Sequence, residues 1–416
     1  MEKVKKVNFL KRIGLFLAIV GPGLITASAD NDAPGIATYS MAGSRYGYNF
    51  LWLLVVVTFG EVIVQETAAR LGAVTGKGTA DLIRERFGVK VTFFAMLCLL
   101  IANLGTTVAQ FAGIAAGAEL LGITRYIAVP VVSVFIAFLV LRGSYSKVEK
   151  FLLVLCLAAL SYVVTAFLIK PDWGEIAKAA ITPSVILETD YIFAVLATIG
   201  TTITPWGIFY MQASVVDKGV DADDYHLTRA DVIFGALWGN IISAFIIICT
   251  GAVLFSSGIE VEEAEHAAMA LAPLAGEWSK LLFTTGLMGA SILAAMVLPL
   301  STVYAVTEAF GWERGLDNNR SEAPVFYGLY VAVILISVII VLIPGIPLFP
   351  IMWLSQSMNA ILLPVLLILL LKLANDKELL GKWVNKKRQN YLTIFLTILI
   401  TVITIALFAI PIFNKG

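Results

Sequence analysis

The chain has 416 residues, of which 59% are apolar and only 14% are charged, and its formal net charge is zero. Soluble domains carry about 25% charged residues, so this composition excludes an ordinary soluble domain. The mean hydropathy of +0.90 makes lipid the expected solvent. Three cysteines, Cys98, Cys156 and Cys249, lie in apolar stretches without the spacing of metal ligands, and we interpret them as core residues.

Apolar segments of about 20 residues, the length that crosses a bilayer as a helix, recur along the whole chain. We identify eleven, near 14–42, 47–72, 91–121, 126–141, 150–169, 191–216, 231–256, 280–309, 324–343, 347–371 and 391–413. The stretches between them are too short for an added soluble domain. The pattern therefore predicts one all-α transmembrane domain over residues 1–416.

The basic residues are distributed unevenly between alternate gaps of this pattern. If the N-terminus is cytoplasmic, 23 of the 29 Lys and Arg residues fall on the cytoplasmic side and 6 on the other. Cytoplasmic loops carry such an excess of Lys and Arg. We therefore expect a multi-pass protein of the cell membrane, with its N-terminus inside and its C-terminus outside.

The first segment carries acidic residues near its middle, Asp30 and Asp32, followed by Pro34 and Gly35. Each carboxylate at mid-membrane costs roughly 2.5–3.5 kcal/mol, so it needs a partner or a water-filled cavity. Pro34 removes a backbone donor and Gly35 relaxes the chain, so the helix should unwind here. Unwinding frees carbonyl oxygens, which bind hard cations.

The sixth segment is interrupted in the same way, by Pro205 and Gly207. Paired interruptions in two halves of a membrane protein indicate a transport site between inverted repeats. The repeats would span about 14–169 and 191–371, and the helix near 391–413 would be peripheral.

At this point the residues resemble a known family of membrane transporters. The run Gln65–Gly76 and its continuation Arg84–Gly88 are similar to the second helix and following loop of the natural resistance-associated macrophage protein (NRAMP) family of divalent-metal transporters. Gly21–Gly23 and Ser355–Gln356 also fit that family. The resemblance covers nearly the whole chain and implies the leucine-transporter fold, with eleven helices of which the first and sixth are broken.

Several site positions depart from the family pattern. Asp32 matches the family's metal-binding Asp, but Gly35 stands where the family has an Asn ligand. Thr204 replaces the family's Met and Trp206 replaces its His. Thr201 falls where the family offers a backbone carbonyl, which any residue can supply.

The third helix departs from the family pattern as well. Thr107 and Gln110 occupy the positions of an Asp and a Glu that the family associates with proton transfer, and neither can carry a proton at ordinary pH. This combination resembles the NRAMP-related magnesium transporters, a branch with an enlarged site for a hydrated ion and no proton coupling.

The remaining ligands form a hard site made only of oxygen atoms. Asp32 and Thr204 would bind the ion together with freed carbonyls, Gln356 and Asn359 would complete the site, and Asp30 would support it from nearby. Soft sulfur ligands favour transition metals, whereas Mg²⁺ prefers oxygen and keeps several waters. We predict uptake of Mg²⁺, with Mn²⁺ also admitted, driven by the membrane potential.

Acidic residues of the second segment have separate interpretations. Glu66 is expected to pair with Arg70 one helical turn later. Glu61 lies deeper, where it would either line the cavity or be hydrogen-bonded in the core. A proton-coupled Mn²⁺ or Fe²⁺ symporter that uses Asp30 or Glu61 is therefore an alternative within the same fold.

More distant alternatives are a sodium-coupled organic-solute carrier, which the second-helix motif argues against, and a sensor that binds without transport. The sequence contains no His cluster and no Gly-rich phosphate loop. We therefore expect neither enzymatic activity nor a cofactor. The expected partners are a divalent metal ion and the lipid bilayer, without nucleic acid, and the expected state is a monomer.

Overall fold

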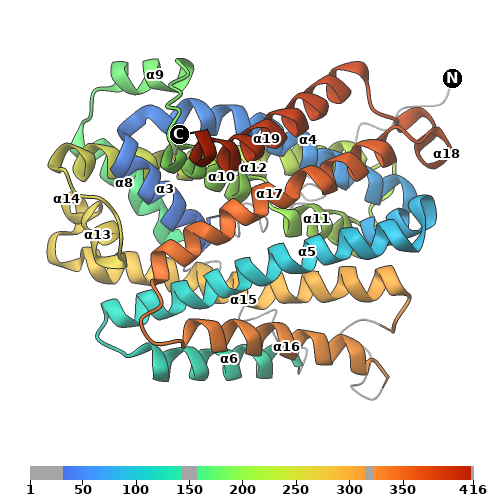
Figure 1. Ribbon diagram of the computed structural model, residues 1–416, viewed down its shortest axis with the longest axis horizontal. Helices are drawn as coiled ribbons and strands as arrows, with labels where there is room; N and C mark the ends of the chain where they lie inside the picture. The colour runs from blue at the N-terminus through green and yellow to red at the C-terminus, as the bar shows by residue number, and fades with distance from the viewer. Residues whose placement is uncertain (1–30, 142–156, 314–321, 414–416) are drawn as a thin grey trace, which may run out of the picture.

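A computed structural model describes residues 31–141, 157–313 and 322–413, and the regular elements within these ranges are helices (Figure 1). The first half contains α3 (Ala33–Tyr46), η1 (Gly47–Phe50), α4 (Leu51–Thr75), α5 (Thr79–Leu120), α6 (Arg125–Leu141), η2 (Leu157–Ala159), α8 (Leu160–Ile169) and α9 (Trp173–Ile181). The second half contains α10 (Thr189–Thr202), α11 (Pro205–Asp217), α12 (Tyr225–Val253), η3 (Phe255–Ser257), α13 (Ala264–Met269), α14 (Ala272–Ala275), η4 (Gly276–Trp278), α15 (Ser279–Phe310), α16 (Pro324–Val341), α17 (Leu348–Ala374), α18 (Lys377–Leu380), η5 (Gly381–Trp383) and α19 (Lys387–Phe413).

The helices match the hydropathy pattern, because each of the eleven predicted segments contains at least one described helix. Eight helical stretches of the described chain are long and apolar enough to cross a bilayer, and shorter apolar helices lie at 125–141 and 157–169. The third helix begins earlier than predicted, at Thr79, and bends at Gly88, whose φ of 75° suits a residue without a side chain.

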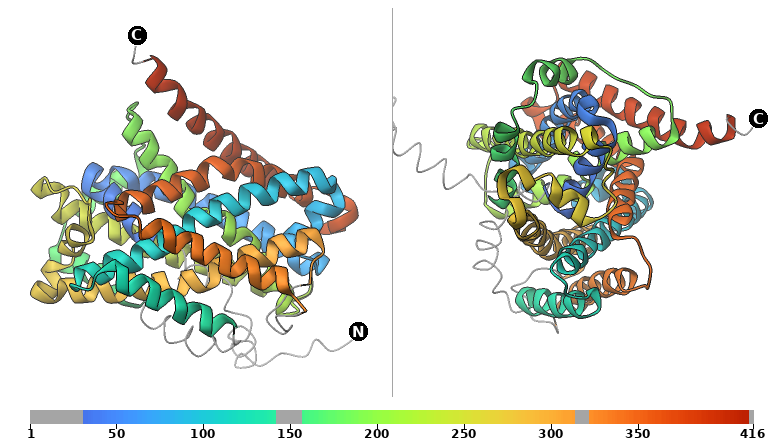
Figure 2. Two further views of the ribbon diagram at one scale, coloured as in Figure 1. Left: turned by 60° about the horizontal axis from the view of Figure 1, so that its bottom comes forward. Right: turned by 90° about the vertical axis from the view of Figure 1, so that its left-hand side faces the viewer.

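The long helix α5 is central to the packing. Its most extensive contacts are with α15 and α17, which run beside it in Figure 1, while α6 and α16 lie together at one edge. On the other side of the bundle, α3 packs against α12, α17 and α10. Helix α19 packs against α17, α10 and α4, and its C-terminal part extends away from the bundle in both views of Figure 2.

Glycines allow close helix crossings next to the predicted breaks. A Cβ atom on Gly200 of α10 would lie 1.9 Å from the Gln356 carbonyl oxygen of α17. A Cβ atom on Gly113 of α5 would lie 2.2 Å from the Ala33 Cβ atom at the start of α3. Membrane helices associate through such small residues because close backbone approach maximises van der Waals contact. These crossings therefore fix the positions of α3 and α10 relative to their neighbours.

The break in the sixth segment is confirmed. Helix α10 ends at Thr202, Ile203 and Thr204 are not helical, and α11 begins with Pro205 in its first turn. Proline suits the first position of a helix because its missing N–H has no intrahelical partner there. In the first segment, α3 begins at Ala33 with Pro34 in its first turn and Asp32 as the N-cap. Asp30 and the preceding residues lie outside the described ranges.

The crossing at Gly200 provides a test of this packing. We expect Gly200→Ala to lower the thermal stability of the purified protein by about 1–3 kcal/mol, since the added methyl group must separate α10 from α17. Gly328→Ala in α16 is the control, because a Cβ atom there meets no other atom within 4 Å. Alanine favours a helix by about 1 kcal/mol over glycine, so the control should be neutral or stabilising. Equal melting temperatures in detergent for the two variants would contradict the proposed crossing.

Candidate ion site

The Asp32 carboxylate lies at the start of α3 and is only 4% exposed. Its Oδ1 atom accepts a hydrogen bond of 2.9 Å from the Gly35 backbone N–H. Its Oδ2 atom accepts a second hydrogen bond from Nε2 of Gln110 on α5. The positive end of the helix dipole favours an anion at an N-terminus. The break therefore places a buried carboxylate where the backbone itself stabilises its charge.

The second break brings oxygen atoms to the ends of α10 and α11. In a continuous helix the Thr201 carbonyl would accept from the N–H of residue 205, and Pro205 has none. Thr204 is the N-cap of α11, yet its side chain makes no capping bond, and its buried hydroxyl has no hydrogen-bond partner. The break thus removes the intrahelical donor for the Thr201 carbonyl and leaves the Thr204 hydroxyl unpaired.

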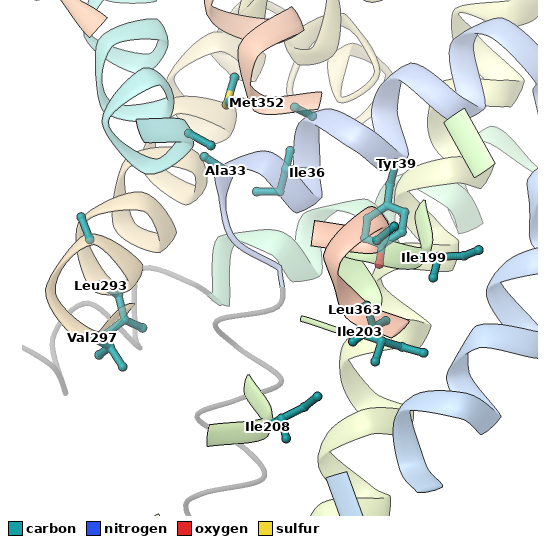
Figure 3. Close-up of a cluster of buried hydrophobic side chains, with 14 of the residues drawn as sticks. Ala33, Ile36, Tyr39, Ile199, Ile203, Ile208, Leu293, Val297, Met352 and Leu363 are labelled. Atoms are coloured by element: carbon teal, nitrogen blue, oxygen red, sulfur yellow. The ribbon is translucent and has the colours of Figure 1, made fainter. Parts of the chain in front are cut away.

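A hydrogen bond joins the two broken helices. The Tyr39 hydroxyl of α3 lies 2.9 Å from the Thr202 hydroxyl in the last turn of α10. Since Thr202 donates its own proton to the Thr198 carbonyl, Tyr39 must be the donor in this pair. Figure 3 shows Tyr39 beside Ile199 of α10, within the apolar core that surrounds both breaks.

Gln356 and Asn359 of α17 lie against the end of α10. The Asn359 amide donates at 3.0 Å to Thr106 of α5, at 3.0 Å to the Gln356 side chain and at 3.5 Å to the Gly200 carbonyl. Gln356 donates to the neighbouring Ser355 hydroxyl at 2.9 Å. These predicted site residues therefore form a buried polar network that supports the last turn of α10, and neither of them is hydrogen-bonded to Asp32.

The polar face of α5 contains neutral side chains. Thr107 donates at 2.7 Å to the Asn103 carbonyl of its own helix, and the Asn103 amide donates at 2.8 Å to Thr302 of α15. Gln110 is the member of this face that reaches Asp32. The side-chain oxygens of Asn103 and Gln110 are both buried without a partner.

Trp206 forms a wall next to the second break. It is only 1% exposed and packs against Leu298 of α15, with its ring 5.9 Å from that of Tyr210. The indole N–H has no hydrogen-bond partner, and it can donate but cannot accept. A bulky donor of this kind is suited to bounding an ion site and unsuited to binding the ion.

One residue of the site was missed by the sequence analysis. Asn31 precedes Asp32, donates at 3.1 Å to the Gly239 carbonyl of α12 and accepts at 3.1 Å from Ser243. These bonds attach the non-helical segment to α12. The sequence could have indicated Asn31, because it is a polar residue inside a predicted helix break.

The acidic residues of α4 are buried and have polar partners. The predicted pair between Glu66 and Arg70 is confirmed, with 3.4 Å between Oε1 and Nε, and both residues are buried. Glu61 is 2% exposed and accepts a hydrogen bond of 2.5 Å from Asn240 of α12. Glu61 is thus hydrogen-bonded in the core, one of the two interpretations considered for it.

Cavities lie at opposite ends of the molecule, on either side of the buried carboxylate. Near the C-terminal end of α5, a cavity of about 650 Å³ is lined by charged residues that include Arg45, Glu119, Arg125, Glu262 and Glu263. Near the start of α5, a cavity of about 340 Å³ is lined by residues that include Lys77, Asp81, Asp217, Lys218 and Glu308. In the described residues, no three His, Cys, Asp or Glu side chains gather into a metal-binding group. Asp32 therefore has no acidic cluster around it within those ranges.

An interrupted sixth segment and a buried carboxylate at the start of α3 are features typical of membrane transporters with a central ion site. The model of the natural resistance-associated macrophage protein-like family matches residues 23–409, and the chain belongs to this family. The protein is accordingly a divalent metal ion transporter, and the metal ion is its substrate.

The curated relatives cover almost the full length of the chain. The divalent metal cation transporter MntH of Aeromonas hydrophila is 27% identical over 378 residues, 89% of this chain and 90% of its own. MntH of Bacillus subtilis is 25% identical over 402 residues, 94% of this chain and 92% of its own.

The solved structures share the fold. The manganese transporter of Eremococcus coleocola superposes with a TM-score of 0.74 at 21% identity, over 97% of this chain and 88% of its own. The nucleobase-cation-symport transporter Mhp1 superposes with a TM-score of 0.59 at 13% identity, over 94% of this chain and 92% of its own.

The bond between Tyr39 and Thr202 can be tested by removing one hydroxyl. We expect Tyr39→Phe to lower stability by about 1 kcal/mol and to weaken metal binding several-fold, because the two broken helices lose a connection. The matched control is Tyr330→Phe, which removes a buried hydroxyl without a partner from α16 and should be neutral or stabilising. Thermal unfolding and metal titration of both variants provide the comparison. Identical behaviour would show that the bond does not hold the site together.

Proposed function

We propose that this transporter carries Mg²⁺ into the cell, admits Mn²⁺ as well, and does so without proton coupling. The observation that carries the proposal is the set of groups around Asp32. The Asp32 carboxylate is held by a backbone N–H and by the neutral amide of Gln110. The break before α11 offers the hydroxyl of Thr204 in place of a thioether.

The proposed ligands are the Asp32 carboxylate, the Thr204 hydroxyl and the Thr201 carbonyl. Mg²⁺ binds oxygen and releases its waters reluctantly, so it needs few protein ligands and room for water. Gly35, without a side chain, provides space on the α3 side. Asp30 would act from nearby, as predicted.

We do not include Gln356 and Asn359 among the proposed ligands. Their amides are engaged with each other, with Thr106 and with the Gly200 carbonyl. They would therefore position the end of α10, and through it the Thr201 carbonyl, while remaining outside the ligand set.

The absence of proton coupling is proposed from the neutral groups on the route. Thr107, Gln110 and Trp206 carry no titratable side chain, and the Thr107 hydroxyl is engaged with its own helix. An inside-negative potential of about 100 mV contributes roughly 2.3 kcal/mol per elementary charge, or about 4.6 kcal/mol for a divalent ion. This driving force is sufficient for uptake without a second ion.

The membrane context follows from the charge pattern. We propose a monomer in the lipid bilayer of the cell membrane, with the N-terminus inside and the C-terminus outside, as the excess of Lys and Arg on one side supports. Alternating access would come from movement of the repeats near 14–169 and 191–371 about the ion. The helix near 391–413 would remain peripheral.

Uptake into proteoliposomes tests the site. We expect the wild type to take up Mg²⁺ and Mn²⁺ under an inside-negative potential, and Asp32→Ala to lose at least about 90% of that uptake, because the site loses its charge. Asp172→Ala is the control, since Asp172 is also a helix N-cap but is exposed at the start of α9.

Normal uptake by Asp32→Ala would overturn the assigned site. A pH-sensitive dye inside the same vesicles tests the coupling. Acidification that follows the metal flux would instead favour the proton-coupled Mn²⁺ or Fe²⁺ symporter.

The hardness of the site is tested by adding sulfur. We expect Thr204→Met to strengthen Mn²⁺ and Cd²⁺ binding relative to Mg²⁺ by about ten-fold, because a thioether is a soft ligand. Thr204→Leu controls for side-chain size without sulfur. Uptake of Mg²⁺ in the presence of competing Mn²⁺ or Cd²⁺ measures the preference of each variant. The same preference in both variants would contradict a role for the ligand atom at position 204.

A further inference from the structure

The side-chain amide of Gln110 makes one contact and leaves one atom free. Its Nε2 atom donates to Asp32 Oδ2, while its Oε1 atom is buried without any hydrogen-bond partner, and the residue is 0% exposed. Buried polar atoms are nearly always paired, so an unpaired carbonyl beside the ion site calls for a function.

The hydrogen bond between Gln110 and Asp32 fixes the orientation of the Gln110 amide. An ionised carboxylate can only accept hydrogen bonds, so the nitrogen of Gln110 must face Asp32. A carboxylate that binds a metal ion is ionised, and the orientation therefore holds while the ion is present. The carbonyl oxygen consequently points away from the carboxylate oxygen that the nitrogen holds.

The position of Gln110 is fixed by the helix crossing one turn further along α5. A Cβ atom on Gly113 would lie 2.2 Å from the Ala33 Cβ atom and 2.6 Å from the Ser291 hydroxyl, so α5 is in contact with the first residue of α3. Gln110 lies on the same face, three residues earlier. The backbone at Gln110 is therefore held next to the start of α3, and the hydrogen bond to Asp32 holds its amide there.

A partly hydrated cation presents a particular hydrogen-bonding surface. Each bound water directs its lone pair at the metal, so its O–H groups point outward and require acceptors in the outer shell. A carbonyl oxygen meets this requirement, whereas the indole N–H of Trp206, which is also buried and unpaired, does not.

We propose that Gln110 is a specificity-determining residue that holds Asp32 with its nitrogen and accepts a hydrogen bond from a metal-bound water with its oxygen. The inference rests on the proposed function, because it assumes that the ion at Asp32 keeps water. In the proposed function, Gln110 matters only because it cannot carry a proton. The inference adds a second role, in which Gln110 itself favours strongly hydrated ions.

The test compares half-saturating concentrations for Mg²⁺ and Mn²⁺ uptake in proteoliposomes. Gln110→Leu should raise the Mg²⁺ value about ten-fold, the effect of one lost hydrogen bond of about 1.4 kcal/mol. The Mn²⁺ value should rise less than about three-fold, because Mn²⁺ gives up water more easily. The half-saturating concentration for Mg²⁺ divided by that for Mn²⁺ should therefore rise.

A second variant and a control keep the result interpretable. Gln110→Asn keeps the amide but is one methylene shorter, so it cannot reach both partners and should shift the ratio in the same direction. Asn103→Leu removes another unpaired buried carbonyl from the same face of α5, two turns from Gln110 and without contact to Asp32. Its ratio should equal that of the wild type.

An equal rise for both ions would overturn the inference, since a residue that only positions Asp32 affects every ion that Asp32 binds. An unchanged Mg²⁺ value would overturn it as well. Failure of the proposed function has a different signature, namely absence of Mg²⁺ uptake by the wild type or normal uptake by Asp32→Ala.

Discussion

The hydrogen bond between the Asp32 carboxylate and the Gly35 N–H determines how the rest of the site is arranged. A carboxylate buried in a membrane protein is costly unless fixed dipoles stabilise its charge. The N-terminus of α3 supplies them, because its first N–H groups have no partners within the helix. The interruption that exposes those N–H groups therefore also supplies the residue that satisfies them. The N-cap of α3 and the proposed ion ligand are therefore the same residue.

The second break presents a helix end of the opposite polarity to the start of α3. Helix α10 presents its C-terminal end, where carbonyl oxygens lack partners, and Pro205 ensures that the Thr201 carbonyl cannot be satisfied by continuing the helix. A cation between the breaks would meet an anion fixed by one helix end and carbonyls released by another. The Tyr39 hydroxyl, bonded to Thr202, keeps these ends together. At the proposed site, the attraction for a cation would thus come from helix ends as well as from an ionised side chain.

The features that could be predicted from the sequence are those with local causes. Hydropathy located a helix in every segment, proline located the interruption before α11, and the spacing of Glu66 and Arg70 predicted their ion pair. The contact between Gln110 and Asp32, 78 residues apart, depends on the rotation of α5 against α3, which the sequence of either helix leaves open. The same limit explains Gln356 and Asn359, whose amides are turned toward Thr106 and Gly200.

Space at the site depends on backbone contacts as well as on the small side chains around it. Removing a side chain from a packed core usually lets the surroundings relax into the gap, which limits the room that is gained. Here Gly113 brings α5 into contact with Ala33, and Gly200 brings α10 into contact with α17, so these pairs of helices are already at their closest approach. Relaxation by moving these pairs of helices together is therefore blocked. For the hydrated ion proposed above, the crossings at Gly113 and Gly200 would keep the helices from closing on its waters.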